Sequence, residues 1–328
     1  MKECVESRIR EPKISVIIPC YNAEKTISYA LNSLVSQTFK EFEVVIVNDG
    51  STDKSIEVVQ RYMGILDVQL ISQKNKGVST ARNVAIQNSK GRYIMFLDSD
   101  DEYHSECLSF LLNEIERNNV DIVTSRYKFS NSYDEKLEKI NCNKKITDKQ
   151  ELYKIYNYKR VNKINFVNCI FKRDIIQNNG VLFSRDIRYG EDSLFLLEYL
   201  FYCNQVEITD AVLYKYMILE NSASKARNYE RIQIIEAFKR AKFLWDTDEV
   251  FDSEISQYAV DRAIWAQAKD FAIADKELFS KLQEDYDVKV AMINMAHNSD
   301  EKLVRISALV YCVSAKLFCL LIKLFAII

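Results

Sequence analysis

The sequence predicts an α/β fold: a mostly parallel sheet with helices on both faces, followed by a helical C-terminal extension. Through residues 13–125, short β-branched apolar runs alternate with segments of helical periodicity. Such runs are typical of strands buried on both faces, and the alternation is typical of a parallel sheet. Residues 228–300 are rich in Ala, Glu and Lys at amphipathic helical spacing, which predicts the helical extension.

Five strands and four intervening helices are expected in the first part of the chain. The apolar run "ISVIIPC" is the clearest strand, and Asn22 can cap the helix after it. Ser51 or Asp53 can cap the second helix. Residues 129–165 are polar and weakly patterned, so we expect a mobile connection followed by a helix. The expected strands are 14–20, 42–49, 68–72, 91–98 and 120–129, and the expected helices are 22–39, 54–63, 77–89, 106–118 and, later, 192–203.

Composition excludes some classes of protein. A net charge of -2 over 328 residues gives no indication of nucleic-acid binding. Eight cysteines without zinc-like spacing are typical of reduced thiols in a cytosolic protein, and two histidines leave little for histidine-based sites. The N-terminus has no apolar stretch typical of a secretory signal.

The stretch "YIMFLDSDDEY" places three carboxylates within four residues at the end of an expected strand. Oxygen ligands without His or Cys favour Mg²⁺ or Mn²⁺, usually together with substrate phosphates. We therefore expect the Asp98–Asp101 cluster to face a divalent cation. The alternative is local: Ser99 or Asp100 caps the next helix, with Glu102 and Glu106 as acids of its first turn, and Asp101 can serve as a cap of the same helix.

Two further segments end strands at the same expected edge of the sheet. Asp49, in "VNDGSTD", can accept the imide N–H of a uracil or thymine. "KNKGVSTARN" brings Lys74, Lys76 and Arg82 to the start of a helix, where cations and amide dipoles favour a diphosphate. The alternative for these residues is a solvated charged loop, which is favoured for Lys76 when it is taken alone. Together these segments predict a base-binding carboxylate, a phosphate clamp and a metal site.

Farther along, "RYGEDSLF" places Glu191 and Asp192 at the start of a helix, after Gly190. A carboxylate in this position can take the proton of an attacking hydroxyl. The alternative is that both acids only stabilise the helix dipole.

The segments "ISVIIPCYNAEKTISYALNSLVSQTFKEFEVVIVNDGSTDKS", "NKGVSTARN" and "GRYIMFLDSDD", with "RYGEDSLF" later, resemble the family 2 glycosyltransferases of GT-A fold, as found in bacterial capsule and exopolysaccharide synthesis. The resemblance implies that Asp49 binds the base, that Asp98 contacts the nucleotide and metal, and that Asp100 ligates Mn²⁺ or Mg²⁺. It implies that Asp192 is the catalytic base. Glu191, the adjacent acid, is expected either to orient Asp192 or to contact the acceptor. One departure is Ala85, where the family commonly has Gly. The implied nucleotide-binding residues are Pro19, Tyr21, Asn22, Glu24, Asp49, Lys74, Gly77, Arg82, Asp98 and Ser99.

The function expected is therefore inverting, metal-dependent transfer of a sugar from a UDP-sugar to a lipid-linked glycan. One alternative enzyme is a sugar-nucleotide pyrophosphorylase, which normally has a Gly-rich N-terminal loop that this chain lacks. An aspartyl phosphatase would carry its DxD on the first strand, whereas here it follows the fourth. The non-enzymatic alternative is a membrane-docked scaffold.

The C-terminal stretch "LVRISALVYCVSAKLFCLLIKLFAII" is apolar with a few cations. As one continuous helix at about 100° per residue, it would align Lys302, Arg305, Lys316 and Lys323 in one stripe. This pattern favours a helix lying on an anionic membrane surface, and hence a peripheral protein on the inner face of the cell membrane. The alternatives are burial in a core or a homo-oligomer interface. The expected domains are 1–217 (nucleotide half 13–125, acceptor half 126–217), 218–302 and 303–328.

Overall fold

A computed structural model of the chain describes residues 11–132, 143–158, 165–218 and 228–325. The chain forms two compact units. The first unit comprises Met1–Ile146, Ile164–Leu182 and Asn204–Ile218. The second comprises Thr147–Lys163, Phe183–Cys203 and Leu219–Ile328. Part of the connection expected over 129–165, namely 133–142 and 159–164, lies outside the described residues.

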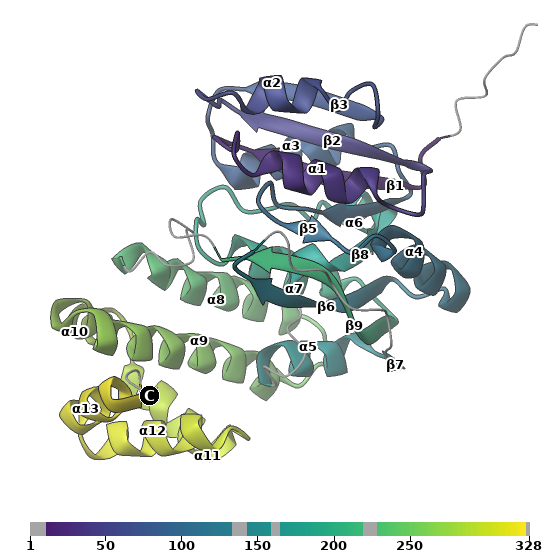
Figure 1. The fold of residues 1–328 in the computed structure, drawn as a ribbon. Helices are drawn as coiled ribbons and strands as arrows, with labels where there is room; N and C mark the ends of the chain where they lie inside the picture. Colours follow the sequence, from purple (N-terminus) through teal and green to yellow (C-terminus); the bar gives the residue numbers. More distant parts are fainter. Residues whose placement is uncertain (1–10, 133–142, 159–164, 219–227, 326–328) are drawn as a thin grey trace, which may run out of the picture. The chain divides into compact units, whose positions relative to one another are not determined.

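The first unit is built on a nine-stranded sheet in the order β3-β2-β1-β4-β8-β6-β9-β5, with β7 beside β9 (Figure 1). β1, β2, β3 and β4 pair in parallel, as the apolar runs predicted. β8 is antiparallel to both of its neighbours, β4 and β6, and β6 pairs in parallel with β9. The strands are β1 (Ile14–Cys20), β2 (Phe42–Asp49), β3 (Val68–Gln73), β4 (Tyr93–Phe96), β5 (Glu102–Tyr103), β6 (Ile122–Ser130), β7 (Lys144–Thr147), β8 (Cys169–Lys172) and β9 (Val206–Met217).

Six strands of the sheet run in the same direction. Because β8 is antiparallel to both β4 and β6, β6 runs in the same direction as β4. The carboxyl ends of β1, β2, β3, β4, β6 and β9 therefore lie at one edge of the sheet. Ligands of such sheets bind beyond this edge. The expected α/β class is confirmed, and the antiparallel strands β8 and β5 are part of the same sheet.

Helices cover the sheet where the periodicity placed them. α1 and α3 lie on opposite sides of the β1–β2 part of the sheet in Figure 1, and α3 packs on both strands. α4 packs against β6, β8 and β9. The helices of this unit are α1 (Ile27–Val35), α2 (Ser55–Gln60), α3 (Val78–Asn88), α4 (Cys107–Asn118), α6 (Arg173–Asn179) and the short 3₁₀ turn η2 (Phe166–Asn168).

The expected helix caps are wrong. Thr26, not Asn22, precedes α1, because the Asn22 side chain accepts the Thr52 N–H at 2.9 Å instead. Lys54 precedes α2, although Asp53 Oδ1 accepts the Ser55 N–H at 3.0 Å. Glu106 precedes α4, so none of the Asp98–Asp101 side chains caps that helix. Asn22 therefore connects two loops, whereas Asp53 contacts both the start of α2 and the loop after β1.

The second unit is helical and is built around aromatic side chains. Trp245 lies against the rings of Tyr153 and Phe251, and its indole N–H donates to the Leu197 carbonyl at 3.0 Å. The Phe183 and Phe195 rings stack with their centroids 4.1 Å apart. The helices are α5 (Lys149–Tyr158), α7 (Glu191–Phe201), η4 (Tyr229–Ile232), α8 (Gln233–Trp245), α9 (Ser253–Ala274), α10 (Lys276–Asp285), α11 (Val288–Asn298), α12 (Lys302–Val313) and α13 (Ala315–Phe325).

The prediction of a single continuous C-terminal helix is also wrong. The chain leaves helical geometry at Ser314 (φ -161°, ψ 120°), which separates α12 from α13. The Ser314 hydroxyl accepts the Leu317 N–H at 3.4 Å, as expected of Ser at a helix start. The one stripe of four cations predicted from an unbroken helix therefore does not form. Among the described residues, no helix has the length and apolar content needed to cross a membrane.

Candidate nucleotide and metal site

Asp49 ends β2 and holds the loop that follows β3. Its Oδ1 accepts hydrogen bonds from Gln73 Nε2 at 2.7 Å and from the Lys76 N–H at 2.8 Å. Its Oδ2 accepts the Gly77 N–H at 2.8 Å. Asp49 is 4% exposed, so these bonds replace most of its hydration. The sequence predicted a ligand-binding carboxylate, and the structure adds that the same group shapes the loop leading into α3.

Two glycines permit this close approach of loops. Gly50 has φ +76°, and a Cβ on it would lie 2.8 Å from the Asn75 backbone nitrogen. Gly77 has φ +88°, a conformation costly for residues with a Cβ, and it precedes α3 directly. Lys74 and Lys76 are exposed beside this helix start. The predicted phosphate clamp thus consists of exposed cations beside the N-terminus of an 11-residue helix.

The loops after β1 and β2 are connected by reciprocal hydrogen bonds. The Asn22 N–H donates to Ser51 Oγ at 3.0 Å, and the Glu24 N–H donates to Asp53 Oδ2 at 3.0 Å. Glu24 Oε2 in turn accepts the Lys54 N–H at 3.0 Å. Two of the predicted nucleotide-binding side chains therefore hold the loops together. Of the other two predicted residues nearby, Tyr21 is exposed in the loop after β1, and Pro19 is half-buried near the end of β1.

Arg82 is the positive partner of the acidic cluster within the chain. Its Nη2 lies 2.9 Å from Asp98 Oδ1, and its guanidinium lies over the Phe166 ring, 4.6 Å from the centroid. Arg82 is 5% exposed, so its charge is desolvated and is balanced by Asp98. Sequence reasoning assigned Arg82 to the nucleotide pocket and did not foresee this ion pair.

The remaining carboxylates of the cluster have separate environments. Residues 98–101 form a turn closed by the Asp101 N–H donating to the Asp98 carbonyl at 3.1 Å. Asp98, Ser99 and Asp100 are half-buried, whereas Asp101 is buried. Burial, and then the charge of Asp98, raises the pKa of Asp100 to about 6. Burial and the charges of Asp100 and Asp98 raise the pKa of Asp101 well above its usual value.

Asp101 connects the turn to the end of β9. Its Oδ2 accepts the Tyr214 hydroxyl at 2.6 Å, and its Oδ1 accepts the Met217 N–H at 2.7 Å. The Tyr214 oxygen also accepts the Asp98 N–H at 3.3 Å. Asp101 is thus a structural anchor of the acidic turn. Sequence reasoning missed Tyr214 and Phe166, because nothing local to either residue indicates its distant partner.

The donor set at this edge suits a hard divalent cation shared with substrate. In the described part of the chain, no three His, Cys, Asp or Glu side chains converge closely enough to hold a metal by themselves. Mg²⁺ and Mn²⁺ are commonly held by one or two carboxylates plus phosphate oxygens, and Asp98 and Asp100 provide two half-buried carboxylates. His104 Nδ1 accepts the Glu106 N–H at 3.1 Å just before α4.

Glu191 and Asp192 begin α7 in the second unit, after Gly190. Gly190 has φ +92°, and a Cβ on it would lie 3.0 Å from Ile234 Cα on α8, so this position requires glycine. Asp192 Oδ1 accepts its neighbour's N–H, that of Ser193, at 2.7 Å. Both acids are half-buried and lie in the first turn of the helix. Their catalytic roles stay predictions.

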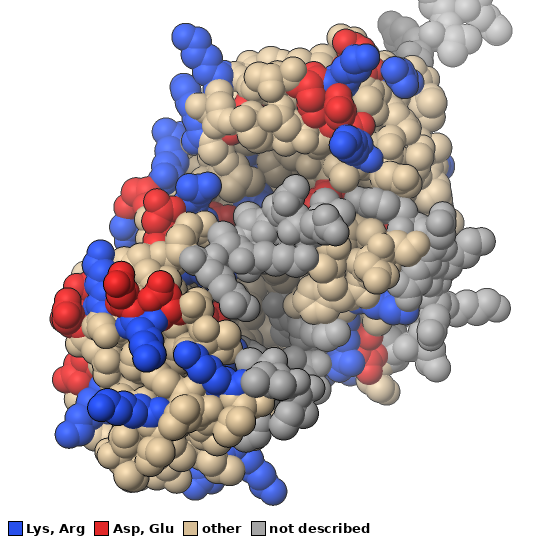
Figure 2. Space-filling model, turned by 60° about the vertical axis from the view of Figure 1, so that its left-hand side comes forward, with Lys and Arg blue, Asp and Glu red and all other residues tan. Residues whose placement is uncertain are grey.

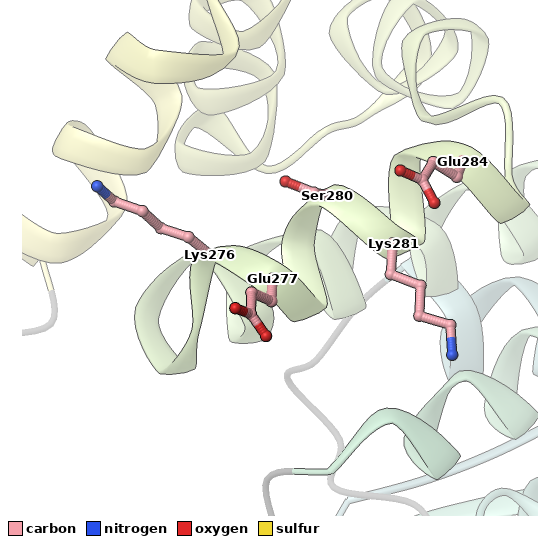
Figure 3. A pocket seen from close by; sticks show the side chains of 5 residues that line it. All are labelled: Lys276, Glu277, Ser280, Lys281 and Glu284. Atoms are coloured by element: carbon pink, nitrogen blue, oxygen red, sulfur yellow. The ribbon is translucent and has the colours of Figure 1, made fainter.

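Two surface hollows lie on the helices of the second unit. One of about 350 Å³ is lined by Lys276, Glu277, Ser280, Lys281 and Glu284 (Figure 3). All five belong to α10, and in Figure 3 they project to different sides of that helix. Ligand pockets are mostly apolar with a few convergent polar groups. This hollow is therefore a charged depression on the surface of one helix.

Comparison with known proteins identifies the family. Residues 15–180 match the model of the glycosyl transferase family 2, about half of the chain. The matched segment contains the Asp49 loop, the Arg82–Asp98 pair and the acidic turn. The chain belongs to glycosyl transferase family 2.

Individual relatives share this region. The chain is 32% identical over 219 residues to the uncharacterized glycosyltransferase EpsJ of Bacillus subtilis, covering 65% of this chain and 63% of EpsJ. It is 28% identical over 215 residues to the poly(ribitol-phosphate) beta-N-acetylglucosaminyltransferase TarS of Staphylococcus aureus, covering 62% of this chain and 35% of TarS. The chain thus spans less than two thirds of these relatives.

Solved structures show the same fold. Residues 1–349 of S. aureus TarS, solved in complex with UDP-GlcNAc, superpose with a TM-score of 0.71 at 20% identity, covering 95% of this chain and 90% of that one. The mannosyltransferase PcManGT of Pyrobaculum calidifontis, solved with GDP-Man and Mn²⁺, gives a TM-score of 0.55 at 16% identity, covering 96% and 88%. The expected GT-A fold and family are confirmed, and the pyrophosphorylase and phosphatase alternatives are set aside.

Proposed function

We propose that this chain transfers a sugar, with inversion, from a UDP-sugar to a hydroxyl of a lipid-linked glycan during surface-polysaccharide synthesis. The observation that carries the proposal is the arrangement at the carboxyl edge of the first unit's sheet. There Asp49 organises the loop before α3, and the Arg82–Asp98 pair adjoins the acidic turn. This is the position at which open α/β sheets bind ligands.

Asp49 retains the capacity to bind a uracil. An ionised carboxylate has about four lone-pair sites, and the loop uses three of them. The remaining site, on Oδ2, would accept the imide N–H of the base. A UDP donor is also supported by TarS, whose fold this chain shares and which was solved with UDP-GlcNAc.

The diphosphate would lie at the start of α3, where Lys74 and Lys76 are exposed. Free N–H groups and the helix dipole favour anions at such a helix start. Because Asp98 balances the charge of Arg82, the guanidinium positions that carboxylate rather than acting as a free phosphate ligand. Asp98 and Asp100 would hold Mn²⁺ or Mg²⁺, and this ion would offset the charge of the departing diphosphate.

The transfer itself is one displacement. The acceptor oxygen bonds to the anomeric carbon as the bond from that carbon to the diphosphate oxygen breaks, and UDP leaves with the electron pair. The acceptor proton passes to the Asp192 carboxylate, which acts as the base. No carboxylic acid is needed for the leaving group, because a diphosphate leaves readily. Glu191, the adjacent acid, would orient Asp192.

A donor panel tests this function. UDP-, GDP- and dTDP-sugars are added with Mn²⁺ or Mg²⁺, and binding is read by thermal shift and turnover by donor hydrolysis. We expect stabilisation and hydrolysis with a UDP-sugar, both lost on chelation and in Asp100→Asn. Preference for a GDP-sugar would contradict the role of Asp49, and binding without hydrolysis would favour the scaffold alternative.

The acceptor would be presented at the inner face of the cell membrane, where the chain would be a peripheral protein. This part of the proposal is supported by the apolar and cationic composition of residues 303–328. Extracted lipid-linked glycans can be supplied as acceptors, with product detected by mass. Transfer only to water-soluble acceptors would contradict it.

A further inference from the structure

The outward faces of α12 and α13 are apolar. On α12, the buried residues Val304, Ala308 and Tyr311 define the inward side. At about 100° per residue, Ile306, Leu309 and Val313 lie roughly opposite that side, and Leu303 lies on its flank. On α13, the exposed leucines lie away from the buried Phe318 and Ile322. We call this set the C-terminal apolar face: Leu303, Ile306, Leu309, Val313, Leu317, Leu320 and Leu324, each between 49% and 81% exposed.

Four cations and no acids accompany this face. Lys302 and Arg305 are exposed on α12, and Lys316 and Lys323 are exposed on α13. Residues 302–325 contain no Asp or Glu. Figure 2 shows Lys and Arg side chains around an uncharged surface at its lower left, where the C-terminal helices lie. Each helix therefore combines outward leucines with outward positive charge.

The acids that lie near α12 belong to neighbouring segments. Glu284, Asp285 and Asp287, together with Lys289, line a hollow that also includes Tyr311 and Cys312. On α12, Cys312 lies roughly 120° or more around the helix from Ile306 and Leu303. The acids thus adjoin the flank of α12 that is farthest from these two apolar residues.

We propose that the C-terminal apolar face docks the protein on an anionic lipid surface, with the α12 and α13 side chains inserted at the headgroup boundary. Contiguous exposed apolar residues mark interaction sites, and cations of one sign among them match anionic headgroups. A two-fold contact with a second copy would instead oppose this cationic patch with itself. The proposal deepens the membrane location proposed above, but binding to lipid does not require transferase activity.

Flotation of the full chain with vesicles tests the docking. We expect co-flotation with vesicles containing phosphatidylglycerol and little with pure phosphatidylcholine. Lys316→Glu with Lys323→Glu should lower binding to anionic vesicles about tenfold or more, since each cation near such a surface contributes favourably. Leu317→Gln with Leu320→Gln and Leu324→Gln should abolish it, while the exposed positions leave folding intact.

A matched control separates this face from exposed apolar groups in general. Phe243 on α8 is 81% exposed and lies outside the face, so Phe243→Gln should bind vesicles as the unchanged chain does. Circular dichroism confirms folding of each variant, and sedimentation measures self-association. Equal binding by the triple-leucine variant would overturn the proposal. The proposal would also be overturned if the unchanged chain formed a dimer that the triple-leucine variant disrupts and did not bind vesicles.

If docking failed while the donor panel still gave UDP-sugar hydrolysis, only the proposal of membrane docking would be wrong. If docking held while no donor were hydrolysed, the enzymatic proposal would fail instead. The two outcomes are distinguishable because the variants lie on α12 and α13, and the donor assay needs no lipid.

Discussion

The Tyr214 hydroxyl donates to Asp101 Oδ2 at 2.6 Å and accepts the Asp98 N–H at 3.3 Å. One phenol thus joins β9 to both ends of the acidic turn. Tyr214 is fully buried, and its ring lies edge-on against Tyr103, with the centroids 5.6 Å apart. The position of the two proposed metal ligands therefore depends on a strand more than 100 residues farther along the chain.

Tyr214→Phe should loosen the acidic turn. The substitution removes both the donor to Asp101 and the acceptor of the Asp98 N–H. The buried Asp101 carboxyl group then has one fewer partner, at a cost of about 1–3 kcal/mol of unfolding free energy. We also expect Mn²⁺-dependent UDP binding to weaken, because Asp98 and Asp100 lose their support. Chemical denaturation and calorimetric titration of UDP with and without Mn²⁺ measure the two effects.

Tyr103→Phe is the matched control. Tyr103 is equally buried and loses one hydrogen bond, from its hydroxyl to the Phe96 carbonyl at 2.7 Å, but it does not touch the acidic carboxylates. It should destabilise the protein without a specific loss of Mn²⁺-dependent binding. Equal losses of UDP binding in both variants would show that Tyr214 acts only through general stability.

Asp49→Asn should free the loop before α3. An amide has only one acceptor oxygen. It can accept either the Gly77 N–H or the hydrogen bonds from Gln73 and Lys76, but not both sets. We expect faster hydrogen exchange at the Lys76 and Gly77 amides and roughly tenfold weaker UDP binding, equivalent to one lost hydrogen bond to a charged group. Exchange measured by mass spectrometry and UDP titration report the two results.

Asp67→Asn serves as the control, because Asp67 is exposed just before β3, at the opposite end of that strand from the loop. It changes the charge equally and should alter neither measurement. Unchanged exchange in Asp49→Asn would contradict the role of Asp49 in holding the loop.

Sequence patterns identified the parallel strands and the acidic edge because both depend on local order. The buried runs of β1, β2 and β4 are continuous and apolar, and the polar groups at their ends are adjacent in sequence. β8 and β9 were not predicted, since their pairing joins segments far apart in the chain. For the same reason, the partners of Asp101 could not be read from "DSDDEY".

The break at Ser314 illustrates a different limit. Periodicity assigns a face to every residue only while a helix continues, and one residue of extended backbone resets the phase. The composition of the segment correctly suggested an amphipathic surface, but its geometry required the structure. The amphipathic surface is shared by two helices rather than arranged along one.

Asp192→Asn should separate catalysis from binding. The amide oxygen can still accept the Ser193 N–H, so α7 should begin as before, but the amide cannot take a proton. We expect transfer to fall about 100-fold or more, as for loss of a general base, with UDP binding unchanged. Glu191→Gln should have a smaller effect. Normal transfer by Asp192→Asn would show that another group is the base.

Asp121 predicts how stability depends on pH. Burial opposes its charge, but the Lys172 ammonium at 2.9 Å and the Asn204 and Gln205 N–H groups hold the pKa of Asp121 below its ordinary 3.8. A lowered pKa stabilises the folded state above about pH 4 and loses that contribution as the pH falls through the folded value. Asp121→Asn should therefore cost about 3 kcal/mol near neutral pH and much less in acid.

The exposed ion pair Lys13–Glu116 is the control for the cost predicted for Asp121→Asn. Its side chains are 44% and 34% exposed, with a nitrogen–oxygen distance of 3.2 Å. Water screens such a pair, so Glu116→Gln should cost at most about 1 kcal/mol. Denaturant unfolding of both variants from neutral pH to about pH 3 measures the difference, since the Asp121 contribution begins to be lost below the ordinary pKa of 3.8. A penalty for Asp121→Asn that stays constant over this range would mean that packing, rather than the charge of Asp121, holds these segments together.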